Sequence, residues 1–200
     1  MAKHEVTFPV TDPQEILKLK AGDEVTVQGH IIGIRDRTQI RIFDQKVEPP
    51  MNLGGAFLLH TAPNVRKVSE DAEGRGTYEK ICIGTTTSAR MVRFTEPLGR
   101  QYGVRAICGK GGFPDEAIEP MHELGMVYFA IVGGAAALET TQIEEIEDVM
   151  WEELMPECLW KFRVKDFGPL TVGIDAHGNS LYRDVQTRAK AKLEELFARL

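Results

Sequence analysis

The chain has 200 residues, of which 42% are hydrophobic, so it is long enough and apolar enough to fold around a substantial core. Its formal charge of −6 and its scattered Lys and Arg residues argue against a nucleic-acid partner, which requires a basic surface. The N-terminus lacks the apolar run of a secretory signal, and no stretch reaches the ~18 apolar residues of a membrane span. We therefore expect a cytoplasmic protein with no membrane partner, folded as a single domain over residues 1–200.

The N-terminal half of the sequence predicts mostly strands. In chain order, the apolar patterns indicate a strand over residues 6–10, a helix over 16–20, a long strand over 24–34, a short buried strand over 56–60 and a hairpin over 65–84. The stretch Asp12 to Glu15 supplies a capping signal for the helix, and Gly29 marks a bulge in the long strand. After Arg35-Asp36, the residues Ile40, Ile42 and Phe43 give only a mixed helical signal before Pro49-Pro50.

The C-terminal half alternates strands and helices. The patterns indicate a helix beginning near Thr86, a strand over 104–108, a helix over 115–124 ended by Gly125, a strand over 126–132, strands over 159–164 and 170–174, and a final helix over 181–200 with one apolar stripe. Residues 143–149 fit a half-exposed strand and a helix almost equally well. The small residues from Gly133 to Ala137 permit either close approach of a ligand or partner helix, or simple tight packing. The alternation predicts an α/β fold in which helices flank a mixed sheet.

Two polar loops, residues 85–91 and 109–112, each follow directly after an apolar strand-like run. If the two preceding strands are parallel neighbours, both loops leave the same edge of a sheet, where open α/β sheets bind ligands. Thr86 and Arg90 are four residues apart, so on a helix they share one face, and together with Lys110 they suit a carboxylate or a phosphate. The same residues are also compatible with a helix cap, a surface arginine and a glycine-rich turn.

The cysteines and histidines lack the spacing of a metal site. Cys82, Cys108 and Cys158 include no C-x-x-C pair, and the five histidines show no ligand spacing. We therefore expect buried, reduced, structural cysteines, and no metal ion or iron–sulfur cluster bound by this chain.

Several stretches, in their order and spacing, carry a resemblance to a known family. They are residues 19–23, 35–36, 84–91, 109–112, 133–138 and 155–179. From about Lys18 to Leu181 the chain resembles the β subunit of class I iron–sulfur fumarate hydratases and L-tartrate dehydratases. The last stretch, with Phe167-Gly168-Pro169-Leu170, is more similar to the tartrate dehydratase branch. The resemblance implies a swivelling β/β/α-type domain.

The resemblance also implies an activity, that of a hydro-lyase. Such an enzyme adds or removes water across the C2–C3 bond of a four-carbon dicarboxylate, converting L-tartrate to oxaloacetate or interconverting fumarate and malate. On the family pattern, Arg35, Arg90 and Lys110 bind the substrate's carboxylates, and Thr86 is the hydroxyl that abstracts the proton. The 4Fe-4S cluster belongs to a partner α subunit, and its open iron binds the departing hydroxyl as a Lewis acid. The implied assembly is α2β2, with a homodimer contact that the sequence does not place.

The chain departs from the family pattern at three points. Gln39 replaces the histidine of the pattern Arg-Asp-x-x-His, Thr85 replaces the proline of Gly-Pro-Thr-Thr, and Ala62 replaces the glycine of a Gly-Pro pair. Gln cannot take up a proton near neutral pH, so an acid–base role of that histidine is lost or moved. The sequence leaves open whether the substrate is tartrate or fumarate and malate. A non-catalytic module of the same fold, which binds an anion or takes part in assembly, is the alternative function.

Overall fold

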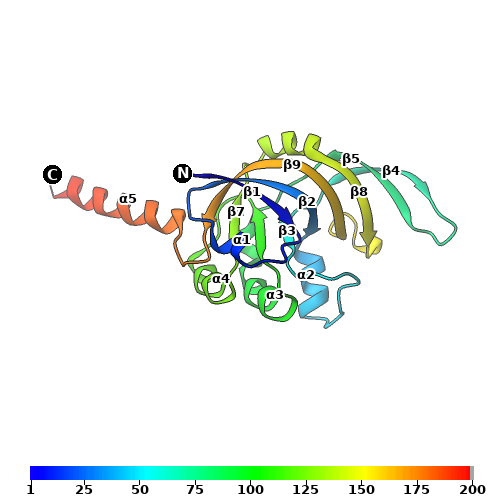
Figure 1. The fold of residues 1–200 in the computed structure, drawn as a ribbon, viewed down its shortest axis with the longest axis horizontal. Coiled ribbons are helices and arrows are strands. Elements are labelled where there is room, and N and C mark those ends of the chain that lie inside the picture. The colour runs from blue at the N-terminus through cyan, green and yellow to red at the C-terminus, as the bar shows by residue number, and fades with distance from the viewer. Residues whose placement is uncertain (199–200) are drawn as a thin grey trace.

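The computed structural model describes residues 1–198, and its centre is a five-stranded mixed sheet that closes on itself like a barrel (Figure 1). In spatial order the strands are β2 (Glu24–Ile34), β3 (Phe57–His60), β6 (Ala106–Gly109), β7 (Val127–Ala130) and β9 (Leu159–Ile174). Neighbours from β2 to β7 are parallel, whereas β9 runs antiparallel to both β7 and β2 and so closes the ring. β1 (Lys3–Phe8) pairs with β2, and β8 (Ile143–Met150) pairs with β9. The predicted α/β fold with a mixed sheet is confirmed.

Three α-helices lie together on one side of this barrel (Figure 1). They are α2 (Asp36–Phe43), α3 (Thr95–Tyr102) and α4 (Ile118–Leu124). The remaining helical segments are α1 (Gln14–Leu17), α5 (Leu181–Phe197) and the 3₁₀-helices η1 (Ser88–Phe94), η2 (Asp115–Ala117), η3 (Ala135–Gln142) and η4 (Glu152–Leu154).

Side-chain alternation along the short parallel strands divides the core into two apolar layers. Phe57 and Leu59 of β3 belong to the cluster inside the barrel, while Leu58, between them, belongs to the cluster under the helices. Inside the barrel, the Phe57 ring lies 5.3 Å from that of Phe8 and 5.5 Å from that of Phe129, centroid to centroid. Because aromatic rings fill its interior, the barrel is a packed core, and ligand chemistry must lie at its ends or outside.

The long strand predicted over residues 24–34 is confirmed with those bounds as β2, and so is its bulge. The pairing of β2 with β9 shifts register between Val27 and Gly29. Gly29 has a φ of +87°, and a Cβ there would overlap the carbonyl oxygen of Phe8 in β1. Only glycine therefore fits both the conformation and the space at this position.

The two strands predicted over 159–164 and 170–174 are wrong as separate elements, because β9 runs through both. Phe167 and Leu170 still pair with β2 on either side of Gly168 and Pro169. The Gln142 side chain bonds the backbone of Gly168 twice, accepting from its N–H at 2.9 Å and donating to its carbonyl at 2.8 Å. These two bonds replace the ladder bonds that the irregularity removes, so the strand continues. The ambiguous residues 143–149 form a strand, β8.

The predicted hairpin forms β4 (Asn64–Glu70) and β5 (Gly76–Cys82), but these strands make a separate two-stranded sheet. The condition that the strands before Thr86 and Gly109 are parallel neighbours is therefore not met, because β5 and β6 belong to different sheets. The hairpin extends away from the barrel (Figure 1), and near its turn it is held by Glu152, which accepts from the Gly76 N–H at 2.8 Å and from the Tyr78 hydroxyl.

The predicted helix over residues 16–20 is observed earlier, as α1 over Gln14–Leu17, whereas the predicted end of the helix before Gly125 is confirmed. α4 ends at Gly125, whose φ of +60° gives the expected left-handed cap. The helix predicted from Thr86 begins instead at Ser88, as η1, and continues as α3. Thr86 cannot start it, because its N–H donates to the His60 carbonyl at 2.9 Å and its own carbonyl accepts from the Lys110 N–H at 3.1 Å.

The final helix is present as α5, and it projects away from the barrel (Figure 1). Ser180 caps it by accepting from the Arg183 N–H at 3.3 Å. The predicted apolar stripe is not packed within this chain, since Val185, Leu193 and Leu196 are 54%, 52% and 50% exposed. The predicted end of the helix, residues 199–200, lies outside the described residues. Among residues 1–198, no helix combines the length and apolar character needed to cross a bilayer.

We expect that deleting residues 185–200 changes the free energy of unfolding by less than about 1 kcal/mol, because the side chains of residues 185–198 are exposed. The thermal midpoint would then move by at most about 2–4 °C. Scanning calorimetry of the truncated chain checks this, with Leu170→Ala as the control. Leu170 is fully buried, so its truncation is expected to remove roughly 2–5 kcal/mol. A truncated chain as unstable as that control would show that α5 packs on the barrel.

Candidate functional site

The candidate site lies where the parallel strands β2, β3 and β6 end. β2 is followed by Arg35 and β6 by Lys110. The chain that returns from the hairpin runs between the ends of β3 and β6. There the Thr86 N–H donates to His60, the Lys110 N–H donates to Thr86, and the Ser88 N–H donates to the Lys110 carbonyl at 3.1 Å. The Thr86 and Lys110 loops thus lie side by side. They do so because the segment after β5 inserts between the ends of β3 and β6, and not because the preceding strands are neighbours.

Three of the four predicted site residues gather around one carboxylate, that of Asp36. The Arg90 Nη2 lies 2.8 Å from Asp36 Oδ2, and the Arg35 Nε lies 3.4 Å from the same oxygen. The Arg90 Nη2 also donates to the Thr86 hydroxyl oxygen at 3.3 Å. Glu157 approaches Arg35 from the other side, with 3.9 Å between Oε1 and Nε. Arg35, Thr86 and Arg90, which come from two separate segments, therefore form one connected group.

Lys110, the fourth predicted residue, joins this group through its backbone bond to Thr86. Among the described residues 1–198, no carboxylate lies within ion-pair distance of its ammonium group. A Cβ on Gly133 would lie only 2.8 Å from the Lys110 Cδ. The glycine after β7 therefore allows the lysine side chain to lie against the backbone, which gives the small residues of this loop a local function.

The electrostatics of the group are set by the ion pair between Arg90 and Asp36. Its hydrogen bond to Arg90 holds the pKa of Asp36 below its ordinary value, and the same bond raises the pKa of Arg90. Thr86 is 7% exposed, so its hydroxyl faces the guanidinium in a largely water-excluded position. Positive charge beside a buried alcohol stabilises its deprotonated form, and two arginines with a lysine can hold an anion with more than one carboxylate.

Asp36 is the site residue that sequence reasoning missed. The pair Arg35-Asp36 was visible, but the partner of Asp36 is Arg90, 54 positions later in the chain. No periodicity links two residues at that distance.

Gln39, at the position of the family histidine, is fully buried in α2. Its amide nitrogen lies 3.0 Å from the sulfur of Met91, and among the described residues its amide oxygen has no hydrogen-bond partner. The side chain therefore packs under the site as a neutral group and supplies no proton.

The thiols of this chain do not fit an iron–sulfur cluster. Cys108 and Cys158 are fully buried, Cys82 is half-buried on β5, and all three are free. Burial raises the pKa of Cys108 well above its ordinary value and that of Cys158 to about 12, so neither favours the thiolate that iron requires. Within residues 1–198, no group of three His, Cys, Asp or Glu side chains is placed to hold a metal ion. The expectation that Cys82 is buried is wrong, because its strand belongs to the exposed hairpin.

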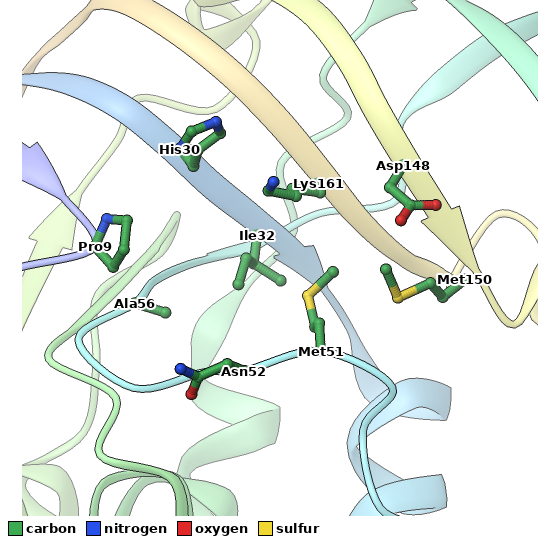
Figure 2. A pocket seen from close by; sticks show the side chains of 9 residues that line it. All are labelled: Pro9, His30, Ile32, Met51, Asn52, Ala56, Asp148, Met150 and Lys161. Carbon is green, nitrogen blue, oxygen red and sulfur yellow. The ribbon is translucent and has the colours of Figure 1, made fainter.

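A cavity of about 520 Å³ lies apart from this group, between the loop at residues 51–56 and strands β2, β8 and β9 (Figure 2). Met51, Met150 and Ile32 give it an apolar floor. Its two basic side chains, His30 and Lys161, both already bond Glu147, at 3.1 and 2.9 Å. None of the four predicted site residues lines it, so we place the functional site at the strand ends.

Comparison with known proteins gives a consistent set of relatives. The family model described as Fumarase C-terminus matches residues 3–185. The putative L(+)-tartrate dehydratase subunit beta of Methanocaldococcus jannaschii is 35% identical over 197 residues, covering 96% of this chain and 98% of the relative. The L(+)-tartrate dehydratase subunit beta of Escherichia coli K12 is 37% identical over 180 residues, covering 90% and 86%. The putative fumarate hydratase class I of Geobacillus stearothermophilus is 35% identical over 188 residues, covering 94% of this chain but only 35% of the relative.

The ion pair at Asp36 makes a prediction that needs no assay of function. In an NMR titration of the carboxyl carbons, we expect Arg90→Gln to move the pKa of Asp36 upward, because the charged form loses its hydrogen-bond donor. The stabilisation from this pair is present above the ordinary pKa of about 3.9 and is lost as pH falls through the lower pKa of the folded state.

Arg93→Gln is the matched control, because Arg93 pairs with Asp44 and lowers the pKa of that carboxyl instead. If Asp36 titrates identically in the wild type and in Arg90→Gln, the ion pair is not formed in solution.

Proposed function

The chain belongs to the Fumarase C-terminus family, and on this premise we propose that it is the β subunit of a hydro-lyase acting on a four-carbon dicarboxylate. One observation carries the proposal, namely the contact of 3.3 Å between Arg90 and the Thr86 hydroxyl within a group that includes Arg35. The names of the relatives support the reaction class, since two are tartrate dehydratase β subunits and one is a fumarate hydratase.

Within this proposal the fold is of the swivelling β/β/α type. Helices α2, α3 and α4 lie on one side of the parallel strands β3, β6 and β7, and the antiparallel pairings of β2, β9 and β8 form a second layer (Figure 1). The site then lies at the edge of the parallel layer, where loops from several strands converge.

The three cations are proposed to hold the two carboxylates of the substrate. Arg35 and Arg90 are already oriented by Asp36, and Lys110 follows β6, where its N–H donates to the Thr86 carbonyl. Fixing a dicarboxylate at both ends places its C2–C3 bond in one orientation relative to the Thr86 hydroxyl. Such positioning converts an encounter into an intramolecular reaction, which is a large part of the catalytic effect of many enzymes.

Thr86 is proposed to take the proton from the carbon next to the departing hydroxyl. The electron pair of the broken C–H bond forms the new double bond as water is eliminated, and in hydration the same steps run in reverse. A threonine hydroxyl is a weak base at its usual pKa, so the adjacent guanidinium must stabilise the deprotonated oxygen. Gln39 takes no part in this proton transfer, since its amide cannot be protonated near neutral pH.

The 4Fe-4S cluster of the family is proposed to lie on a partner α subunit, because the thiols of this chain do not fit one. The word "beta" in the names of the relatives supports the existence of such a partner. We propose an α2β2 assembly in which this chain supplies the dicarboxylate-binding and proton-abstracting half of the site.

Oxygen-free purification of the chain coexpressed with an iron–sulfur α subunit of the family tests the proposal. We expect a brown complex that dehydrates L-tartrate or hydrates fumarate, each followed by its characteristic absorbance. A stable, colourless homo-oligomer that binds a dicarboxylate but never an iron–sulfur partner would instead support an anion-binding module.

Thr86→Ala in the assembled complex is expected to lower kcat by roughly 10²–10⁴-fold, the range for loss of a general base. Thr187→Ala, which removes an exposed hydroxyl on α5, is the matched control and keeps the wild-type rate. Steady-state kinetics under anaerobic conditions measure both. A Thr86→Ala complex with near-normal kcat would remove Thr86 from the mechanism.

The α subunit is expected to contact the loop after β7. Val132, which precedes Gly133, and Leu138, in η3, are 69% and 72% exposed, and the Lys110 side chain lies against Gly133. Val132→Glu would place a charge in an apolar contact and abolish copurification of the α subunit. Leu193→Glu, an equally polar change at an exposed leucine of α5, is expected to leave the complex intact. The reverse pattern in a pull-down would move the interface to α5.

A further inference from the structure

A buried polar hub lies directly beneath the two loops of the site. Its centre is Ser88, which is fully buried at the start of η1. The Ser88 Oγ lies 2.9 Å from the Nδ1 of His60, at the end of β3, and 3.1 Å from the hydroxyl of Tyr128, on β7. The Tyr128 hydroxyl also lies 2.8 Å from the carbonyl oxygen of Gly109, at the end of β6. Four segments of the chain thus meet at one serine hydroxyl.

The hydrogen atoms of this hub can be assigned from its acceptors. Full burial lowers the pKa of His60 to about 3, so the ring is neutral and one of its nitrogens donates while the other accepts. Within residues 1–198 the Nε2 of His60 has no partner. A buried N–H without an acceptor is more costly than a buried lone pair, which favours the tautomer with the proton on Nδ1.

The rest of the chain of hydrogen bonds follows from that tautomer. The Gly109 carbonyl can only accept, so the single proton of Tyr128 donates to it. Ser88 then donates to the Tyr128 oxygen and accepts from the His60 Nδ1–H. Every hydroxyl and the ring N–H have a partner, and all the bonds run in one direction from β3 to β6.

The two ends of this chain of hydrogen bonds, His60 and Gly109, are directly connected to the loops that carry Thr86 and Lys110. The carbonyl of His60 accepts the Thr86 N–H, and Gly109 immediately precedes Lys110, whose carbonyl accepts the Ser88 N–H. A Cβ on Gly109 would overlap the Ser88 hydroxyl oxygen, so the serine side chain occupies the space above that glycine. The hub therefore sets the spacing between the loop that carries Thr86 and the loop that carries Lys110.

We propose that Ser88 is a positioning residue of the dicarboxylate site, whose hydroxyl, oriented by His60 and Tyr128, fixes the distance between Thr86 and Lys110. The proposal rests on the proposed function, because Thr86 and Lys110 are the proton-abstracting and carboxylate-binding groups there. Displacement of such groups by about 1 Å lowers the rate by about 10²-fold even when the reacting groups remain.

The first test uses the full chain without any assay of activity. In ¹⁵N-histidine NMR, we expect His60 in the wild type to carry its proton on Nδ1, and Ser88→Ala to change that tautomer. Amide hydrogen exchange is expected to be faster at Thr86 and Lys110 in the variant. Thr95→Val is the matched control, because it also removes a buried hydroxyl. The Thr95 hydroxyl has no hydrogen-bond partner among the described residues.

The second test uses the assembled enzyme. Ser88→Ala is expected to lower kcat by roughly 10–100-fold with a smaller change in KM, while Thr95→Val keeps the wild-type kcat. Tyr128→Phe removes the next hydroxyl of the relay and provides a second variant in case Ser88→Ala does not fold. If both act through one relay, the double variant loses no more rate than Ser88→Ala alone.

Two results would overturn the proposal. One is an unchanged kcat in Ser88→Ala and Tyr128→Phe, and the other is unchanged exchange at Thr86 and Lys110. An inactive wild-type complex would count against the proposed function alone, because the tautomer and the exchange rates still decide whether the hub positions the two loops.

Discussion

The hydrogen bonds on either side of Thr86 are the interaction on which the candidate site depends. The hairpin formed by β4 and β5 does not belong to the barrel. The chain after it returns along residues 61–62, where the Gly84 carbonyl accepts from the Ala62 N–H at 3.3 Å, and the Thr86 backbone then bonds His60 on one side and Lys110 on the other. Because β3 and β6 are parallel neighbours, their ends leave a space of fixed width for this segment. The same bonds that close the space prevent a helix from starting at Thr86 and delay it to Ser88. One backbone constraint therefore determines both the local structure and the placement of the hydroxyl.

The ion pairs of Asp36 orient the arginine side chains that surround Thr86. Asp36 holds Arg90 at 2.8 Å and Arg35 at 3.4 Å, so two long side chains that would otherwise sample many rotamers are fixed before any anion arrives. The carboxylate also neutralises one positive charge of the group. In the proposed function, the Lys110 ammonium, which has no carboxylate partner within residues 1–198, therefore contributes more to the binding of a dianion. Asp36 orients the two arginines from one side, and the buried Ser88 hub supports the two loops from beneath. The site is therefore preorganised, as catalysis by orientation of the substrate requires.

Elements whose stabilising contacts are local could be predicted from the sequence. The strand over residues 24–34, its bulge at Gly29 and the helix end at Gly125 follow from alternation and from glycine conformations. Prediction failed where distant side chains complete the hydrogen bonding, as where Gln142 allows β9 to continue past Gly168. For the site, loop positions and the family resemblance placed Arg35, Thr86, Arg90 and Lys110, whereas the contact of Asp36 with Arg90 spans 54 positions and leaves no local signal.

The proposed division of chemistry between two chains is consistent with the protonation states of the residues in and under the site. The group can hold carboxylates and, with Arg90 beside it, an oxygen base. Gln39 has no titratable proton, His60 stays neutral because burial lowers its pKa to about 3, and Asp36 stays ionised because Arg90 holds its pKa low, so none of these three donates a proton to the departing hydroxide. In the proposed reaction the departing hydroxide would be received by the partner subunit, on the face of the substrate opposite Thr86. An open site at the strand ends, with exposed apolar residues beside Gly133, is what such a shared reaction requires of the β subunit.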